Sequence, residues 1–296
     1  MKLAIVSAAA IAAAAMAAPA FAKPGPEVHI RHAVARVAVV VEDRHDIAVE
    51  IEQGSSDLPA VRVTRDGAEV RIDGGLRRRG FLNGGDGIRN CNSGPDNPAQ
   101  PGDGASVEVR GVGRVNLSDA PLILIRTPRN VEVDASGAVF GSVGRGAASI
   151  DLGNAGCGYW NVANTEGELS LSIAGSGDIR AGTSGALDIS IGGSGSVTAG
   201  ATRNLDISIG GSGDVVVARA DGPTDVSIGG SGDVDIRGGN VPDLSISIAG
   251  SGDVNFGGVA GDVDVSIVGG GDVTVARATG SVSRSIVGGG DVRIGS

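Results

Sequence analysis

Apolar and polar residues alternate along most of the chain, and from Leu169 onward the alternation returns in one form seven times. Each copy runs apolar, polar, apolar, Ser, Ile, small, Gly, Ser or Gly, Gly, Asp, apolar, any residue, apolar, with few exceptions. Alternation with a period of two predicts short strands that bury one face. The Ile position is filled in every copy, by Ile173, Ile191, Ile209, Ile228, Ile248, Ile267 and Ile286.

Successive copies are 18, 18, 19, 20, 19 and 19 residues apart. One copy cannot bury its apolar face alone, so equivalent strands are expected to stack about 4.8 Å apart. The sequence therefore predicts an all-β fold, a parallel β-helix with coils of 18–20 residues, and the crossover rule predicts right-handed winding. We expect the glycines after each Ile to supply left-handed or strained backbone angles at a sharp corner.

Three regions follow the predicted secretory signal. Residues 23–75 contain alternating segments that would start or cap the solenoid, and residues 105–296 would form the β-helix itself. Residues 76–104 are rich in Gly and Pro and include Arg77-Arg78-Arg79, which predicts a surface loop.

Residues 1–22 have the features of a secretory signal. Lys2 supplies the charged start, an apolar run extends from Leu3 to Ala18, and Ala20-Phe21-Ala22 provides a small-x-small cleavage site. We therefore expect an exported protein of the periplasm, the cell envelope or the extracellular space. No stretch of the predicted mature chain has the length of apolar sequence that a transmembrane helix needs.

The composition agrees with a narrow aliphatic core and argues against several partners. Of 296 residues 52 are Gly, and only 2% are aromatic. The net charge is −10, and removal of residues 1–22, whose one charged residue is Lys2, makes it −11. An acidic chain is a poor match for nucleic acid or for an anionic membrane surface.

Two cysteines, Cys91 and Cys157, lie in the predicted mature chain. In an oxidising compartment an even pair predicts one disulfide bond. The alternative is a pair of free, buried thiols.

One column of acidic residues follows the Gly corner. Stacked coils would align its carboxylates as a weak cation or ligand ladder, with Ser196 as the one break. In the alternative interpretation, each Asp accepts backbone N–H bonds at its own corner. We expect at most weak calcium binding and assign no metal site. The column consists of Asp178, Asp214, Asp233, Asp253, Asp272 and Asp291.

Two further columns would face outward from the strand that precedes the corner. They form either solvated hydroxyl ladders or a repetitive surface for a repetitive partner, such as a glycan or another envelope component. Between Leu169 and Ser296 there are 14 Asp, no Glu and 7 Arg, so an anionic polymer is a poor candidate. The first column is Ser172, Ser190, Ser208, Ser227, Ser247, Ser266 and Ser285. The second is Ser170, Asp188, Asp206, Asp225, Ser245, Asp264 and Ser283.

The sequence offers no catalytic constellation and no cofactor motif. His29, His32 and His45 are expected to be isolated, solvated or strand-edge residues, because no nucleophile or metal-ligand spacing completes them. Tyr159-Trp160 is expected to be a packing wedge where degenerate coils meet regular ones, with a sugar-binding platform as the alternative.

The repeated Ser-Ile-x-Gly-Ser-Gly-Asp-Val motif, the strands between Val28 and Ile72, and the stretch from Thr127 to Trp160 resemble the head GIN domain family of auto-transporter adhesins. The resemblance implies a β-helical fold and an adhesin-like role. We expect an exported, non-enzymatic binding protein of the envelope. The alternatives are a β-helical polysaccharide lyase or hydrolase, and a structural protein that self-assembles through an open C-terminal coil.

Overall fold

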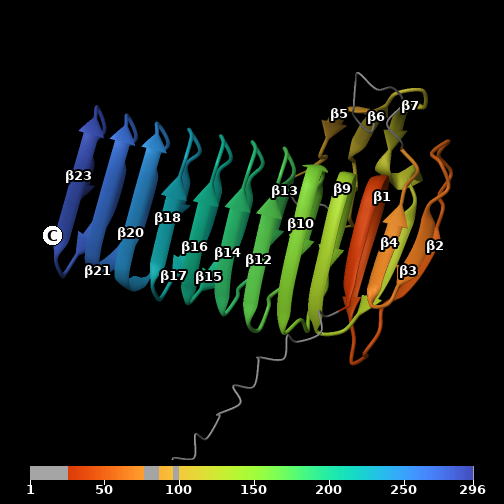
Figure 1. The fold of residues 1–296 in the computed structure, drawn as a ribbon, viewed down its shortest axis with the longest axis horizontal. Helices are drawn as coiled ribbons and strands as arrows, with labels where there is room; N and C mark the ends of the chain where they lie inside the picture. Colours follow the sequence, from red (N-terminus) through yellow and green to blue (C-terminus); the bar gives the residue numbers. More distant parts are fainter. Residues whose placement is uncertain (1–25, 77–86, 96–99, 296) are drawn as a thin grey trace, which may run out of the picture.

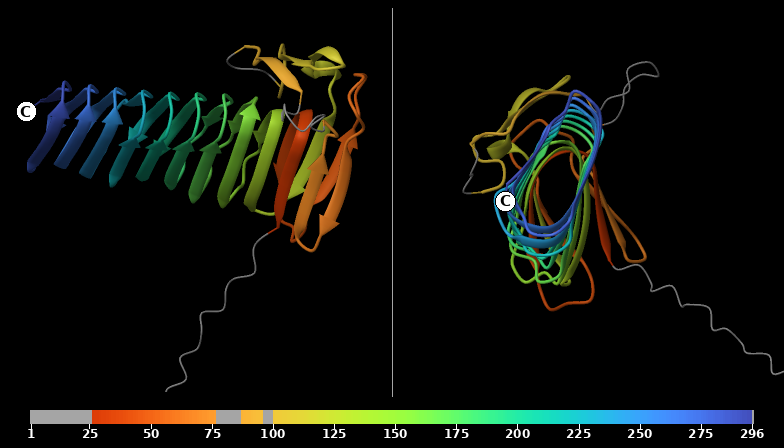
Figure 2. Two further views of the ribbon diagram at one scale, coloured as in Figure 1. Left: turned by 45° about the horizontal axis from the view of Figure 1, so that its top comes forward. Right: turned by 90° about the vertical axis from the view of Figure 1, so that its left-hand side faces the viewer.

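The computed structural model describes residues 26–76, 87–95 and 100–295. The predicted signal at 1–22 and the arginine cluster at 77–79 lie outside the described residues. The chain forms a parallel β-solenoid, which confirms the predicted fold class, and the coils lie in register when viewed along the solenoid axis (Figures 1 and 2).

One continuous parallel sheet, here called the front sheet, runs the length of the solenoid. Its strands point upward in Figure 1 while successive coils advance toward the C-terminal end at the left, so the winding is right-handed as predicted. The long strands β1, β9, β20 and β21 bend at one end and continue into a second parallel sheet, described below. In spatial order the strands are β4 (Glu69–Asp73), β1 (Glu27–Val41), β9 (Asn130–Val143), β10 (Ser149–Cys157), β12 (Glu168–Ile173), β14 (Ala186–Ile191), β16 (Asn204–Ile209), β18 (Thr224–Ile228), β20 (Asn240–Gly250), β21 (Val254–Gly269) and β23 (Val282–Gly288).

A second parallel sheet, here called the return sheet, contains the strands that follow the Gly corner. It also contains the second halves of β1 and β9 and the first half of β21. Its remaining strands are β8 (Leu122–Thr127), β11 (Tyr159–Val162), β13 (Asp178–Ala181), β15 (Val197–Thr202), β17 (Val215–Ala220), β19 (Val234–Ile236), β22 (Val273–Ala278) and β24 (Val292–Ile294).

The N-terminal end is closed by strands that pair in the opposite direction. β2 (Ala48–Glu52) pairs antiparallel with β8, and β3 (Arg62–Asp66) pairs antiparallel with β4. Antiparallel partners at both outer strands end the parallel stacking, because the next coil has no free parallel edge to extend.

A small antiparallel sheet lies on the outside of the solenoid near its N-terminal end (Figure 2). It consists of β5 (Ile88–Asn92), β6 (Ser106–Val109) and β7 (Gly113–Asn116), and a single 3₁₀ turn, η1 (Leu117–Asp119), follows. This differs from the sequence prediction, which treated 76–104 as a loop and began the β-helix at 105. The physical reason is that Val107, Val109 and Val115 bury themselves against the outer face of the return sheet and not inside the solenoid.

One aliphatic core runs through the solenoid from Val28 to Val292. The Ile column is in register from coil to coil, and its members are 1–3% exposed except Ile267, which is 0% exposed, and Ile286 in the last described coil, which is 40% exposed. Trp160 and Phe256 are completely buried among these side chains. Among the described residues, no helix has the length and apolar character needed to cross a bilayer.

Close stacking, and not left-handed backbone angles, explains the glycine that precedes each corner Asp. A Cβ on Gly213 would lie 2.3 Å from the carbonyl oxygen of Gly195 in the previous coil and 2.7 Å from a methyl group of Ile191. The backbone angle of Gly213 is outside the left-handed range. The sequence prediction of strained angles therefore holds only for other glycines, such as Gly269 and Gly288, whose φ values are 141° and 136°.

Candidate functional site

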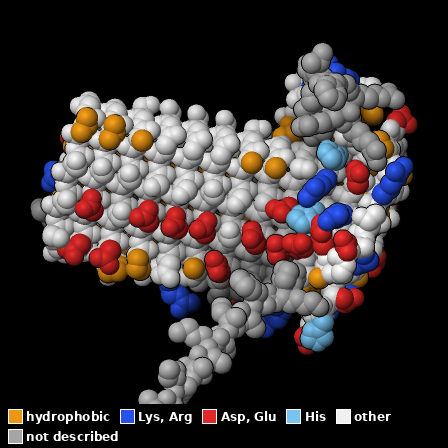
Figure 3. All heavy atoms as spheres, viewed as in Figure 1, with side chains coloured by type: hydrophobic (Ala, Val, Ile, Leu, Met, Phe, Trp, Pro, Cys, Tyr) orange, Lys and Arg blue, Asp and Glu red, His pale blue; other side chains and the backbone are white. Residues whose placement is uncertain are grey.

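The front sheet carries an acidic column that is longer than the sequence suggested. Register places Asp151 beside Ser170 and Glu132 beside Asp151, and the column continues onto β1 and β4, where Glu27 pairs with Glu69. We call this set the acidic column. Its carboxylates, from the N-terminal end, are Glu69, Glu27, Glu132, Asp151, Asp188, Asp206, Asp225 and Asp264, interrupted by Ser170 and Ser245 and followed by Ser283. Figure 3 shows acidic side chains as a row along this face.

A groove of about 610 Å³ follows the C-terminal half of the acidic column. Asp188, Asp206 and Asp225 of the column line it, together with Asp243 and Asp262. The neighbouring Ser column is in register through all seven coils, and its members are exposed or half-buried. The outward orientation of both predicted columns is therefore present in the fold.

The carboxylates in the middle of the column repel one another. Burial, followed by the charges of Asp188 and Asp225, raises the pKa of Asp206. Burial and the charges of Asp134, Glu168 and Asp188 likewise raise the pKa of Asp151. Among the described residues, no arginine forms an ion pair with the four aspartates from Asp188 to Asp264 in this column. The groove therefore presents negative charge that the described part of the protein does not neutralise.

The corner Asp column behaves differently, because its carboxylates bind the backbone. Oδ1 of Asp253 accepts a hydrogen bond from the N–H of Asp272, in the next coil, at 2.7 Å. Asp214, Asp233 and Asp272 each accept the equivalent bond from the corner residue of the next coil. Ser196 donates both its N–H and its hydroxyl to Asp178. These bonds join successive coils. The alternative interpretation of the sequence had placed each bond within a single corner. A ligand role for this column stays a prediction.

His29 is the centre of a charged cluster at the N-terminal end of the front sheet. Its Nε2 lies 3.6 Å from Oε1 of Glu27 and 3.5 Å from Oε1 of Glu69, and its Nδ1 lies 3.2 Å from Oδ2 of Asp134. Arg71 donates two hydrogen bonds to Glu69, and this pairing lowers the pKa of that carboxyl. His29 is thus not the isolated residue that the sequence predicted, because β1, β4 and β9 bring distant carboxylates around it.

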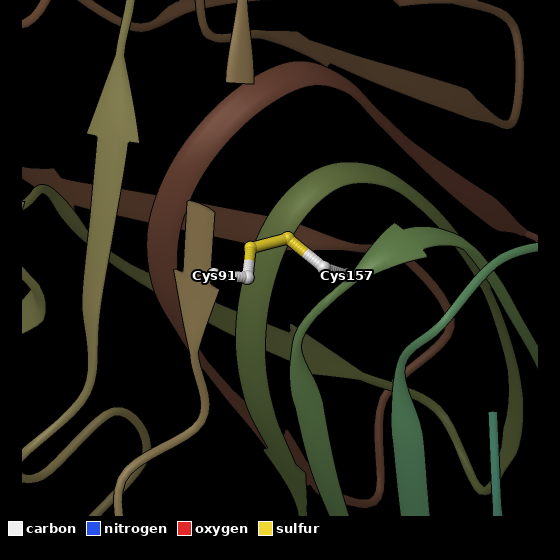
Figure 4. Close-up of a disulfide and its surroundings, with 2 residues drawn as sticks. All are labelled: Cys91 and Cys157. Atoms are coloured by element: carbon white, nitrogen blue, oxygen red, sulfur yellow. A yellow bond between two sulfur atoms is a disulfide. The ribbon is translucent and has the colours of Figure 1, made fainter. Parts of the chain in front are cut away.

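The predicted disulfide between Cys91 and Cys157 is present, with Cα atoms 6.3 Å apart (Figure 4). It joins β5 of the small sheet to the end of β10. Both sulfur-bearing residues pack against the second apolar cluster, which contains Val34, Phe140 and Tyr159. The bond therefore attaches the small sheet to the solenoid at a contact that is already apolar.

Comparison with known protein families agrees with this architecture. The sequence profile of the family described as "Putative auto-transporter adhesin, head GIN domain" matches residues 105–238 and 202–296. The chain belongs to the head GIN domain family. A search among curated proteins found no match.

The head GIN domain match begins at residue 105, so it includes the acidic column only from Glu132 onward. Glu27, His29 and Glu69 precede the matched region, although the structure places them on the same sheet. Tyr159 is 8% exposed and packs with the small sheet, and Trp160 is completely buried in the solenoid core, so both side chains of this pair are packed, as the sequence predicted.

Proposed function

We propose that this head GIN domain protein is an exported, non-enzymatic binding module of the bacterial envelope that holds an extended polysaccharide on its front sheet. The observation that carries the proposal is the C-terminal half of the acidic column: its four aspartates, Asp188, Asp206, Asp225 and Asp264, line a groove of about 610 Å³ and form no ion pair with an arginine among the described residues. A ligand with regularly spaced polar groups matches a surface that repeats about every 4.8 Å.

Charge selects the class of polysaccharide. Neighbouring carboxylates at this spacing repel one another, and a bound group with positive charge relieves that repulsion. Hydroxyl groups can donate hydrogen bonds to the same carboxylates. We therefore propose polysaccharides with amino groups as the preferred partners and neutral ones as weaker partners, whereas anionic polysaccharides would be repelled.

An affinity measurement on immobilised amino-bearing, neutral and anionic polysaccharides tests the proposal. The double variant Asp206→Asn and Asp225→Asn should bind the amino-bearing polymer at least about tenfold more weakly, the loss expected when one or two charged contacts disappear. The matched control, Asp57→Asn and Asp235→Asn, removes the same charge away from the groove and should bind as the wild type does. Equal binding by the two double variants, or a preference for the anionic polymer, would contradict the proposal.

The same polysaccharides separate binding from catalysis. The enzyme alternative predicts that incubation releases new reducing ends and that the Asp206→Asn and Asp225→Asn variant loses this release. We expect no release above a control without protein.

Self-assembly has one observation in its favour. Val282, Ile286 and Val287 on β23 are 39%, 40% and 66% exposed in the last described coil. Exposed apolar strands can pair with a second copy. Light scattering that shows a monomer at high concentration would rule out this alternative.

A further inference from the structure

The cluster around His29 has a donor set that the acidic groove lacks. Glu27 and His29 come from β1, Glu69 comes from β4, and register places Glu27 opposite Glu69 and His29 opposite Asp134 of β9. One ligand atom from each of Glu27, His29 and Glu69 lies within 4.8 Å of the other two. An imidazole nitrogen therefore faces two carboxylate oxygens from separate strands.

The distances favour coordination over direct hydrogen bonding. Nε2 of His29 is 3.5 Å from Oε1 of Glu69 and 3.6 Å from Oε1 of Glu27. Hydrogen bonds from N–H to oxygen are about 2.7–3.2 Å long, so a proton on Nε2 would bind neither carboxylate well. Two ligands that are each about 2.1 Å from a tetrahedral zinc ion lie about 3.4 Å apart, which matches the observed separations.

Asp134 completes the arrangement from the other side of the ring. Its Oδ2 is 3.2 Å from Nδ1 of His29, so the negative charge of this carboxylate stabilises a proton on Nδ1. That tautomer directs the lone pair of Nε2 toward Glu27 and Glu69. A carboxylate behind a histidine in this way orients the ring and increases the basicity of the ligating nitrogen.

The surroundings permit entry of a cation and leave excess negative charge. The side chains of His29 and Glu69 are each 16% exposed, and that of Glu27 is 28% exposed. Arg71 binds Glu69, but each carboxylate oxygen has a second lone pair that remains available to a metal ion. Glu132 on β9 adds a further carboxylate beside Glu27.

We propose that Glu27, His29 and Glu69 bind a divalent transition-metal ion of the zinc class, with Asp134 as the positioning residue behind His29. The imidazole ligand favours zinc over calcium or magnesium, which prefer sites made entirely of oxygen atoms. The site has three protein ligands, so the remaining coordination positions are open to water or to a group from a bound partner. This proposal does not depend on the polysaccharide-binding proposal.

Zinc titration of the purified protein, prepared without a histidine tag, tests the proposal. Calorimetry on the wild type should detect about one strong site per chain. His29→Gln and Glu69→Gln should each weaken that site by at least about tenfold, and Asp134→Asn by about 10–100-fold, the range found for groups that orient a metal ligand. With cobalt in place of zinc, the Asp134→Asn protein should also give an altered visible spectrum, which a loss of stability alone would not produce.

His45→Gln is the matched control, because it removes an exposed histidine that lies among acidic residues elsewhere on the chain. This variant should bind zinc as the wild type does. Thermal melting without metal checks that every variant is folded. His29→Gln and Glu69→Gln each test the site separately, so the test still stands if one of them fails to fold. Unchanged binding by both His29→Gln and Glu69→Gln, or equal loss in His45→Gln, would show only adventitious surface binding and would overturn the proposal.

Discussion

At the scale of single residues, each position of the repeat is determined by the equivalent residue one coil away. Ile228 lies between Ile209 and Ile248 in the core column, and Gly213 has no room for a Cβ beneath Gly195. Asp253 accepts a hydrogen bond from the backbone of the next coil. These contacts explain why Ile, Gly and Asp recur, because each substitution would disturb two interfaces.

The core column predicts a strong contrast between adjacent residues. Ile228→Asp places a carboxylate at a position that is 2% exposed, whereas Ser227→Asp places the same group on the outer face of the same strand. The core variant should lose about 4 kcal/mol or more of stability, and its melting temperature should fall by roughly 10 °C or more. The surface variant should change by less than about 3 °C. Thermal melting followed by circular dichroism provides the measurement, and similar curves for the two variants would contradict the stacked core.

At the scale of elements, the strands of the front sheet place one acid next to another in neighbouring coils. Parallel strands in perfect register make this unavoidable, because equivalent residues lie directly beside one another. Burial, and after it the charges of Asp188 and Asp225, raises the pKa of Asp206, so the neighbouring carboxylates add to the cost of its ionisation. The fold tolerates this repulsion at a surface that we propose is used for binding.

The repulsion predicts a stability change that depends on pH. Because the pKa of Asp206 is raised, the folded chain binds the proton more tightly than the unfolded chain does, so ionisation of Asp206 destabilises the fold as the pH rises above about 4. Asp206→Asn should therefore melt about 1–2 °C higher at pH 7, the effect of removing like charges on adjacent strands. The difference should disappear below about pH 4.

Asp235→Asn on β19 is the control for this experiment, since Asp235 lies near Arg237 and accepts a hydrogen bond from Asn255. It should give no gain at pH 7. A gain for Asp206→Asn that persists in acid would show that charge repulsion is not its cause.

At the scale of the whole molecule, two apolar cores lie side by side, and a disulfide bond links the parts of the chain that form them. The long core belongs to the solenoid, and the second core lies between the small sheet and the outer face of the return sheet. The Cys91–Cys157 bond closes a loop across 66 residues between these parts. The small sheet has only three strands, so it depends on this attachment more than the solenoid does.

Removal of the bond should therefore loosen the small sheet selectively. In Cys91→Ser with Cys157→Ser, the loss of stability should be up to about 4 kcal/mol in the chain-entropy description of a loop of this length. Hydrogen exchange should accelerate in β5, β6 and β7 while β14 to β20 remain protected. The reduced wild-type protein should show the same pattern. Equal acceleration throughout the chain would mean that the two cores unfold as one unit.

The sequence by itself determined the repeating solenoid, its outward Ser and Asp columns and the cysteine pair. Successive copies of the repeat are neighbours both in sequence and in space, so a fixed spacing near 19 residues is sufficient to predict which side chains stack. Only the tertiary structure decided that β4 and β1 extend the front sheet, that Ser106–Asn116 leave the solenoid, and that His29 meets Glu69 and Asp134. Those contacts join segments that share no repeat, and their pairing depends on which apolar faces remain to be covered once the coils have formed.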